Sequence, residues 1–465
     1  GHALQLLGGP CFGGGFGPRP DRVPIHMLDK LSFSHGVHPP EHKDQSSGVP
    51  IRRMPFPEEI VLPLRQHAGK PAKLLVKVSD RVERGDKIAE ADGFVSVPIH
   101  ASAAGEVVGI GWWPHPDGSM AEAVRIKVEK FSPQIPRPRV IPRWEGLDPQ
   151  QVVAAVQKGG VVGLGGAAFP THVKLLPPKD VPIEVLLVNG AECEPFLTTD
   201  HRTMVEFPDR VWFGVRIMMK ALGVGRAVIG IEKNKPDAIE MLEKTKPEDL
   251  NAEVQGLTVK YPQGAEKMLI KAVLGREVPS GKLPMHVGAV VQNVGTIACI
   301  AEIFETGLPL IERVVTVTGP GVRKPGNLIV PVGAKFKDIL NFCGGITENV
   351  TEILSGGPMM GAAQPDLEAP ATKCVTGIVV LTDKESRPRT VYPCISCGHC
   401  LDACPRFLNP SLMGKLSQTA QYQEMTERAN LWDCMLCGAC SYVCPSNIPL
   451  SQMFGMAKYQ LGRIR

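Results

Sequence analysis

The chain has 465 residues, which suggests roughly three domains, and its hydrophobic content of 43% is ordinary for globular proteins. The formal net charge of +4 gives no reason to expect a nucleic-acid partner. The sequence contains no run of about eighteen apolar residues and no secretory signal pattern, so we expect a cytoplasmic protein without a transmembrane helix.

The opening of the chain is rich in glycine and proline, with a run of three glycines at 13–15. Such a composition is typical of chain termini that do not pack on a domain. We therefore expect residues 1–31 to form a disordered arm, or an arm added for expression.

Residues 32–135 are predicted to form a barrel-sandwich hybrid domain. Val76 and Val78 alternate with polar residues, as in a half-exposed strand. The phrase Val-Glu-Arg-Gly-Asp-Lys-Ile at 82–88 resembles a lipoyl/biotinyl-type β-sandwich, which offers a lysine on a hairpin tip to carry a prosthetic group. The corresponding stretch at 91–95 reads Ala-Asp-Gly-Phe-Val and has no lysine. We therefore expect a structural domain and not a carrier.

After a proline-rich linker, residues 145–310 alternate between buried strands and helices. Apolar runs at 183–188, 227–231 and 257–261 are typical of parallel strands covered on both faces, and a helix is expected at 212–222. This pattern predicts a Rossmann-like α/β domain. Ligands of such sheets bind beyond the carboxyl ends of the strands.

A glycine-rich loop lies early in this α/β domain. Gly163, Gly165 and Gly166 would let backbone N–H groups approach a phosphate without obstruction by a Cβ atom. Lys174 follows at helical spacing and could neutralise that phosphate. A loop of this kind is by itself weak evidence for a nucleotide site.

Two polar segments at the ends of predicted strands strengthen that hypothesis. The segment Asn-Gly-Ala-Glu-Cys-Glu-Pro at 189–195 offers carboxylates that can accept hydrogen bonds from ribityl or ribose hydroxyls. The segment Gln-Asn-Val-Gly-Thr at 292–296 offers amide and hydroxyl groups suited to a flavin ring edge or a phosphate. Together with the glycine loop they predict a flavin nucleotide site.

The sequence returns to strand character at 311–365, where an alternating run at 314–318 is followed by a short helix at 336–342. We expect a small β-grasp module there, a connector at 366–390, and a helical domain at 385–465.

That helical domain carries eight of the thirteen cysteines in two runs of the form Cys-x2-Cys-x2-Cys-x3-Cys-Pro. The spacing is typical of bacterial ferredoxins with two [4Fe–4S] clusters, in which the fourth cysteine of each run binds the other cluster. Zinc sites do not need the x3-Cys-Pro ending, and disulfides fit small secreted domains better. One cluster is expected on Cys394, Cys397, Cys400 and Cys444, and the other on Cys434, Cys437, Cys440 and Cys404. Cys193, Cys299, Cys343 and Cys374 are expected to be small buried hydrophobes.

The glycine loop and the two polar segments together resemble a known family. Gly-x-Gly-Gly-Ala-x-Phe-Pro-Thr at 163–171, Asn-Gly-Ala-Glu-x-Glu-Pro at 189–195 and Asn-Val-x-Thr at 293–296 resemble the FMN-binding, NADH-oxidising subunit of respiratory complex I, which also carries a β-grasp SLBB module. That family has one cluster motif of a different form. The two ferredoxin motifs match a narrower group, the C subunit of the Rnf-type (Rsx) electron transport complex. The phrase His-Gly-Val-His-Pro-Pro-Glu-His-Lys at 35–43 is similar to the opening signature of that group.

This resemblance implies FMN and two [4Fe–4S] clusters as cofactors and NAD(H) as substrate. Phe169 is similar to an aromatic residue near the nicotinamide, with a place in the core as the competing interpretation, and Glu194 is similar to a ribose contact. No acid–base residue is needed for hydride transfer, so none is predicted to be catalytic. The resemblance further implies FMN binding by Gly163, Gly165, Gly166, Lys174, Asn189, Glu192, Asn293 and Thr296.

The same resemblance implies a subunit of a ferredoxin:NAD oxidoreductase of the translocase class. Its partners would be a ferredoxin-like iron–sulfur subunit and integral membrane subunits that move the ion. The chain would be peripheral, on the cytoplasmic side of the cell membrane. His35, His38 and His42 could suggest a metal site, but Pro39 and Pro40 favour a surface docking strip for partners.

Two rival functions share much of this layout. One is a cobalamin reductase of bacterial microcompartments, against which the 35–43 phrase argues. The other is a wiring subunit that keeps the clusters but has a degenerate nucleotide site. The intact glycine loop and the acidic segment at 189–195 argue against that second alternative.

Overall fold

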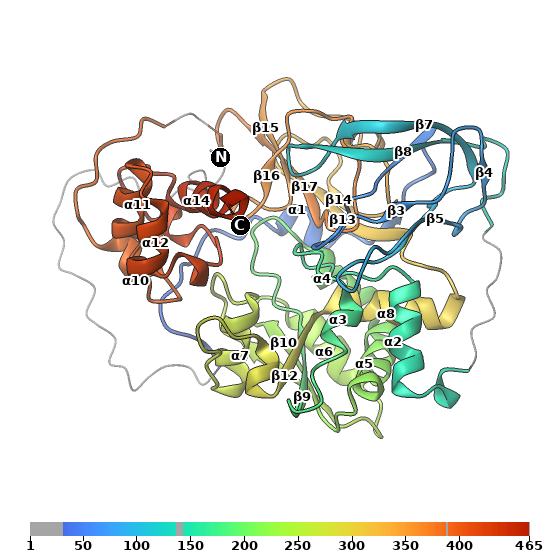
Figure 1. The fold of residues 1–465 in the computed structure, drawn as a ribbon, viewed down its shortest axis with the longest axis horizontal. Coiled ribbons are helices and arrows are strands. Elements are labelled where there is room, and N and C mark those ends of the chain that lie inside the picture. The colour runs from blue at the N-terminus through green and yellow to red at the C-terminus, as the bar shows by residue number, and fades with distance from the viewer. Residues whose placement is uncertain (1–30, 136–142, 387–388, 465) are drawn as a thin grey trace.

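The computed structural model describes residues 31–135, 143–386 and 389–464. Figure 1 shows the strands of the N-terminal part beside β13 to β17 of residues 312–382, with the α/β part below them and the C-terminal helices to the left. The expected arm at 1–31 and the middle of the proline-rich linker lie almost wholly outside the described residues. None of the described helices is both long and apolar enough to cross a membrane.

The N-terminal domain consists of two small sheets that face each other. The first sheet has the order β2-β8-β7-β4, and the second has the order β3-β5-β6. Ile60, Leu62, Ile88, Ile99 and Ile126 point into the space between the sheets and are fully buried. The strands are β2 (Glu59–Pro63), β3 (Lys73–Leu74), β4 (Arg81–Val82), β5 (Lys87–Glu90), β6 (Ile99–His100), β7 (Gly105–Pro114) and β8 (Met120–Val128).

A four-stranded parallel sheet of the order β11-β10-β9-β12 forms the centre of the α/β part. Its strands are β9 (Val185–Asn189), β10 (Ala227–Glu232), β11 (Ala252–Leu257) and β12 (Ala289–Asn293). The strand expected at 257–261 was wrong, because β11 ends at Leu257. Tyr261 leaves the sheet and pairs instead with the backbone of Val37 in an isolated bridge.

Helices cover both faces of this sheet (Figure 1). One face carries the large core that α2, α4, α5, α6 and α8 share, and the opposite face packs on α7. Asp148 starts α2 with a reciprocal capping box to Gln151, and Gly223 ends α5 in the left-handed conformation (φ +66°). The helices are α2 (Pro149–Lys158), α3 (Thr171–Lys174), α4 (Thr199–Glu206), α5 (Pro208–Leu222), α6 (Pro236–Thr245), α7 (Glu266–Leu274) and α8 (Val294–Thr306).

A six-stranded sheet of the order β1-β14-β13-β17-β15-β16 lies between the N-terminal domain and the α/β part. It includes two strands from outside the β-grasp module expected at 311–365. β1 lies within the expected N-terminal domain, ahead of β2, and β17 lies in the stretch 366–390 that was expected to be a connector; β17 is buried along its whole length. The elements are β1 (Arg52–Arg53), β13 (Glu312–Thr318), β14 (Gly326–Pro331), α9 (Phe336–Phe342), β15 (Val350–Ser355), β16 (Ala362–Ala363) and β17 (Gly377–Thr382).

The C-terminal helices repeat the same backbone at an interval of 40 residues. Ser396 and Leu436 both have positive φ (+55° and +56°), and so do Gly398 and Gly438 (+85° and +80°). Each glycine precedes a short helix, and a longer helix follows. The helices are α10 (His399–Ala403), α11 (Pro410–Gln418), α12 (Tyr422–Ala429), α13 (Ala439–Tyr442) and α14 (Leu450–Ile464). The two cysteine runs therefore have matching local structure.

Candidate functional site

Two asparagines end adjacent strands of the parallel sheet and define one edge of the site. Asn189 of β9 and Asn293 of β12 are register partners. The amide of Asn189 donates to the carbonyl of Gly264 over 2.7 Å. The amide oxygen of Asn293 accepts from the backbone N–H of Thr296 over 3.2 Å and so caps α8. The carboxyl ends of the strands are where a parallel sheet binds ligands.

The glycine loop lies directly over the N-terminus of α8. The backbone N–H of Leu164 donates to the hydroxyl of Thr296 over 2.8 Å. A Cβ atom on Gly165 would lie only 3.3 Å from Cβ of Asn293, so only glycine fits here without displacement. Gly166 has a φ of +108°, faces open space and is exposed. The loop therefore presents an open backbone face next to a helix N-terminus, which is an arrangement that binds phosphates.

The carboxylate of Glu192 caps a second helix at this edge. It accepts from the backbone N–H groups of Asp200 and His201 at the start of α4, over 2.8 and 3.1 Å. Asp200 in turn accepts a 2.6 Å hydrogen bond from the amide of Asn293. Burial raises the pKa of Asp200 to about 7, and the neighbouring Glu192 carboxylate adds to this increase. Hydrogen bonds therefore connect the loop that carries Glu192 and the start of α4 to Asn293 at the end of β12.

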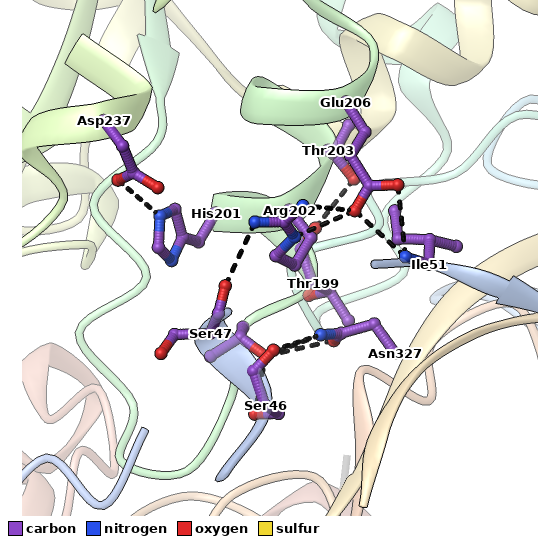
Figure 2. Close-up of polar contacts among 11 residues, drawn as sticks. Ser46, Ser47, Ile51, Thr199, His201, Arg202, Thr203, Glu206, Asp237 and Asn327 are labelled. Atoms are coloured by element: carbon purple, nitrogen blue, oxygen red, sulfur yellow. Dashed lines mark hydrogen bonds and ion pairs between the residues drawn. The ribbon is translucent and has the colours of Figure 1, made fainter. Parts of the chain in front are cut away.

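Helix α4 is anchored on several sides, as Figure 2 shows. His201 pairs with Asp237 over 2.7 Å, and Arg202 donates to the carbonyl of Ser47 over 3.1 Å. Glu206 accepts a 3.0 Å hydrogen bond from the backbone N–H of Ile51. The N-terminal segment of the chain therefore fixes the helix that carries Asp200.

Glu194 points away from these groups and toward the six-stranded sheet. Its carboxylate accepts from the backbone N–H groups of Met359 and Met360 over 2.8 and 2.9 Å, in the turn after β15. A Cβ atom on Gly357 would lie 2.0 Å from the Glu194 side chain, so this close approach requires glycine. Burial raises the pKa of Glu194 to about 7.

Lys43 organises the whole acidic segment from a distance of about 150 positions in the chain. Its buried ammonium donates to the carbonyls of Glu192, Glu194 and Leu197 over 2.8, 3.1 and 2.5 Å. Burial lowers the pKa of Lys43. Sequence reasoning assigned this lysine no role beyond a family signature, because nothing local reveals its acceptors.

The expected surface docking strip at 35–43 is in large part an internal strap. The backbone N–H of Gly36 donates to the carbonyl of Ala403 over 3.2 Å, and the ring of His35 contacts Phe407 at 4.5 Å between centroids. Val37 is buried against Tyr261, and only His38, Pro40 and His42 are exposed. The strap at 35–43 connects the C-terminal helices to the acidic segment at 189–195. Its residues are therefore needed for packing inside the protein.

Lys174 and Phe169 complete the set of residues expected at the site. The ammonium of Lys174 pairs with Glu266 at the start of α7 over 2.6 Å and donates to the carbonyl of Val291 over 3.1 Å. Phe169 is half-buried, and its carbonyl closes the glycine loop by accepting from the N–H of Gly163 over 2.9 Å. Sequence reasoning missed Asp200, Gly264, Glu266 and the role of Lys43, because the partner of each lies at least 75 residues away in the chain.

The cysteines of the C-terminal part line two separate cavities. The walls between the sulfur atoms are apolar, with Ile448 and Leu450 in the first cavity and Leu408 and Phe454 in the second. Each cavity takes three cysteines from one run and the fourth from the other, which is the grouping that the spacing predicts. Cys394, Cys397, Cys400 and Cys444 line the first cavity; Cys404, Cys434, Cys437 and Cys440 line the second.

The two cavities differ in their exposure. Cys394 and Cys397 of the first are exposed, whereas Cys437 and Cys440 of the second are buried. Burial raises the pKa of the Cys437 thiol to about 12. The backbone carbonyl of Cys437 also accepts a hydrogen bond from Tyr261, which follows β11 in the α/β part, so the second cavity lies on the side of the C-terminal part that faces the α/β part.

Comparison with known proteins gives matches for four parts of the described chain. Family models match an RnfC barrel sandwich hybrid domain at 31–130, a Nuo51 FMN-binding domain at 156–302, an SLBB domain at 314–363 and a 4Fe-4S dicluster domain at 390–448. These matches confirm the fold class expected from the sequence.

Curated relatives cover most of the chain, and each is the C subunit of an oxidoreductase complex. The chain is 47% identical over 405 residues to that of the proton-translocating ferredoxin:NAD(+) oxidoreductase complex of Clostridium ljungdahlii, covering 86% of this chain and 88% of that one. It is 41% identical over 402 residues to that of the Na(+)-translocating ferredoxin:NAD(+) oxidoreductase complex of Acetobacterium woodii, with the same two shares. It is 39% identical over 443 residues to that of the ion-translocating oxidoreductase complex of Rhodobacter capsulatus, with shares of 94% and 84%.

A solved structure, an NAD+-reducing [NiFe]-hydrogenase in the air-oxidized state, matches with a TM-score of 0.50 and 20% identity. The match covers 68% of this chain and 64% of that chain. At this level of identity the likeness concerns the fold alone.

Proposed function

The chain belongs to the family of C subunits of ion-translocating ferredoxin:NAD oxidoreductase complexes, and from that premise we propose that it exchanges hydride with NAD(H) and single electrons with partner subunits. Its cofactors are FMN and two [4Fe–4S] clusters, and NAD(H) is its substrate. FMN, when bound, supplies the conversion between two-electron and one-electron transfer. The protein supplies binding, orientation and exclusion of water.

The residues at the strand ends fit a flavin nucleotide. The exposed backbone of Gly165 and Gly166 and the N-terminus of α8 would hold the phosphate, and Gly163 and Thr296 fix the shape of that loop. Two glycines leave a cradle that a Cβ atom would narrow: Gly165 against Asn293, and Gly295 against Asn293 and Asp200. The amides of Asn189 and Asn293 and the carboxylate of Glu192 would bind the hydroxyls and the ring edge.

Two expected contacts need a rearrangement to reach a ligand. Lys174 would have to exchange its pairing with Glu266 for a phosphate oxygen, and Glu194 would have to release the N–H groups of Met359 and Met360 to reach a ribose. We keep both residues in the proposed site, together with Phe169 beside the nicotinamide, because their backbones belong to the loops that surround it.

The cysteine cavities fit iron–sulfur clusters. Each brings four thiols to one apolar cavity on loops that contain residues of positive φ, and in the inner cavity the N–H of Leu436 points to Sγ of Cys434 over 3.5 Å. We propose that Cys404, Cys434, Cys437 and Cys440 hold the cluster nearer the flavin. Cys394, Cys397, Cys400 and Cys444 would hold the cluster nearer the surface, from which a partner can exchange electrons.

One observation carries this proposal: the turn at 261–264 contacts both centres. At one end Gly264 accepts from Asn189 of the nucleotide site, and at the other end the hydroxyl of Tyr261 donates to the carbonyl of Cys437 over 2.7 Å. The nucleotide site and the inner cluster cavity thus share a wall only four residues long. A short, packed separation is what electron transfer between two bound cofactors requires.

The larger assembly follows from the family. We propose that the chain docks, from the cytoplasmic side, on integral membrane subunits that translocate the ion, and that a ferredoxin-like iron–sulfur protein of the complex links it to ferredoxin. This makes the chain the NAD(H)-linked part of a translocase.

The test is an anaerobic titration of the purified, cofactor-loaded chain with NADH, followed by flavin absorbance and by EPR of the clusters. Bleaching of the flavin together with the appearance of cluster signals is the expected result. If only a strong chemical reductant such as dithionite reduces the clusters, the nucleotide site does not work in this chain and the proposal is wrong.

A further inference from the structure

The hairpin that would carry a prosthetic group in a lipoyl-type domain is docked on α3, directly after the glycine loop in the chain. This connection between β5 and β6 has no lysine, but its backbone makes a hydrogen bond to another domain. The carbonyl of Phe94 lies 2.9 Å from Nε2 of His172 on α3. On the neighbouring segment, the backbone N–H of Ala68 donates to the carbonyl of Ala168 over 3.0 Å. The N-terminal domain therefore contacts the glycine loop and the helix that follows it.

Close packing fixes the backbone of this hairpin. Val97 is buried in the main core of the α/β part. Gly69 has a φ of +95°, and a Cβ atom there would lie 2.2 Å from the carbonyl oxygen of Val95. The backbone N–H of Lys70 donates to that same carbonyl over 3.2 Å. A segment held in this way presents its side chains at defined positions.

The side chain of Phe94 nevertheless remains open to solvent. It is 59% exposed, although its ring touches His172 edge-on with 5.9 Å between the centroids. His172 itself is buried and lies three residues after Phe169. A large apolar ring at a rigid, exposed position beside a ligand-binding loop costs solvation in the free protein. A ligand ring packed on it would remove that cost.

We propose that Phe94 forms the outer wall of the NAD(H) site and packs against a ring of the bound dinucleotide. This inference rests on the proposed function, since it assigns the substrate of that same site. The hairpin that carries a covalent prosthetic group in lipoyl-type domains would thus bind the substrate non-covalently in this chain. The flat aromatic face suits nicotinamide or adenine. The hydrogen bond that holds the hairpin on α3 uses the backbone carbonyl of Phe94, so loss of the ring should leave the hairpin in place and flavin retention unchanged.

The experiment measures steady-state NADH oxidation by the full flavin- and cluster-loaded chain, with ferricyanide as the electron acceptor. Phe94→Ala is expected to raise the KM for NADH by about three- to tenfold, the range of an aromatic stacking contact, with kcat within about twofold and flavin content unchanged. Trp112→Ala is the matched control, because Trp112 is a 72% exposed aromatic residue on β7 of the same domain. It should leave KM unchanged.

Phe94→Tyr distinguishes stacking from a purely structural effect, because it keeps the aromatic face. Its KM should stay near that of the wild type. An unchanged KM in Phe94→Ala, a KM in Phe94→Tyr as poor as in Phe94→Ala, or loss of flavin in Phe94→Ala would each overturn the proposal. If the wild-type chain itself does not oxidise NADH, the proposed function has failed, which is a different outcome.

Discussion

The hydroxyl of Tyr261 donates to the carbonyl oxygen of Cys437, 2.7 Å away, across 176 residues of chain. Tyr261 is buried and lies between β11 and α7 of the α/β part, whereas Cys437 lies in a cluster loop. This hydrogen bond is a direct polar link between the nucleotide-binding part and the inner cluster cavity.

Tyr261→Phe tests that link, because the ring keeps its shape and only the donor is lost. An unpaired buried carbonyl costs about 1–3 kcal/mol, so we expect looser attachment of the inner cluster loop. The variant should lose iron faster than the wild type on incubation with a chelator and should show slower NADH-driven cluster reduction, with flavin bleaching intact. Tyr392→Phe is the control, because it changes an exposed tyrosine of the C-terminal part, which carries the cluster loops. Identical behaviour of both variants would show that the hydrogen bond is dispensable.

Lys43→Met should reduce flavin retention. Methionine keeps most of the side-chain length but removes the charge and the three donors, so three carbonyls of the acidic segment lose their partner. At about 1 kcal/mol or more for each carbonyl, the segment that carries Glu192 should become mobile. Flavin content after gel filtration is the measurement, and Lys127→Met, on the exposed side of β8, is the control. A lower thermal midpoint with full flavin content would mean that Lys43 only stabilises the fold.

Glu194→Gln should remove a pH dependence of stability. The pKa of Glu194 in the folded chain is raised to about 7 from 4.5, so the fold favours its protonated form. The resulting stabilisation is complete below about pH 4.5 and is lost as the pH rises through about 7.

Glutamine keeps the acceptor for Met359 and Met360 but does not titrate. The stability of the wild type relative to Glu194→Gln should therefore fall by about 1–3 kcal/mol between pH 5 and pH 8. Thermal unfolding of both proteins in matched buffers measures this difference. The contribution of Asp200 to the pH dependence of stability cancels, because both proteins retain that residue. Parallel curves would contradict the assignment of a raised pKa to Glu194.

Gly166→Asp should abolish flavin binding. The new side chain would stand in a left-handed conformation (φ +108°) on the open face of the loop, and its charge would repel a phosphate. Gly118→Asp is a close match, since Gly118 also has a positive φ (+82°) and lies in a turn between β7 and β8 with no atom closer than 4.0 Å. The strain, about 1–2 kcal/mol, is common to both variants. Equal flavin content in both would rule out the loop as the phosphate site.

Cys444→Ala should remove the cluster that is held mainly by the first cysteine run, although Cys444 belongs to the second run. Because Cys444 lines the cavity of Cys394, Cys397 and Cys400, the variant should keep about half of the iron. Adding Cys394→Ala should cause no further loss, whereas adding Cys434→Ala should remove nearly all of it. Iron analysis and EPR of the two double variants show which cysteines share a cluster. If adding Cys394→Ala removes the remaining iron and adding Cys434→Ala does not, each run binds its own cluster.

The features that could be predicted from the sequence are local in the chain. The cysteine runs, the glycine loop and the strand ends at Asn189 and Asn293 each depend on residues within about ten positions. Even the exchange of Cys404 and Cys444 follows from a spacing repeated twice. The domain models that match the chain agree with the fold class predicted from these patterns.

Long-range pairings were not accessible from the sequence. The acceptors of Lys43 lie about 150 residues away, and β1 pairs with β14 across more than 270 residues. Lys174 has helical spacing to the glycine loop, but its ammonium finds Glu266, 92 residues away. The run that forms β17 is apolar and short, and it becomes a strand only because β13 and β15 provide edges on both sides.

The strap at 35–43 also bears on the order in which the chain matures during synthesis. The ribosome makes this segment well before the cluster-bearing part, and each domain can begin to fold as it emerges. The partners of Gly36 and His35, however, are Ala403 and Leu401, and the second of these follows His35 by 366 residues. The contacts between the strap and the cluster-bearing part can therefore form only after that part has been translated, so the two ends of the described chain are joined late in folding.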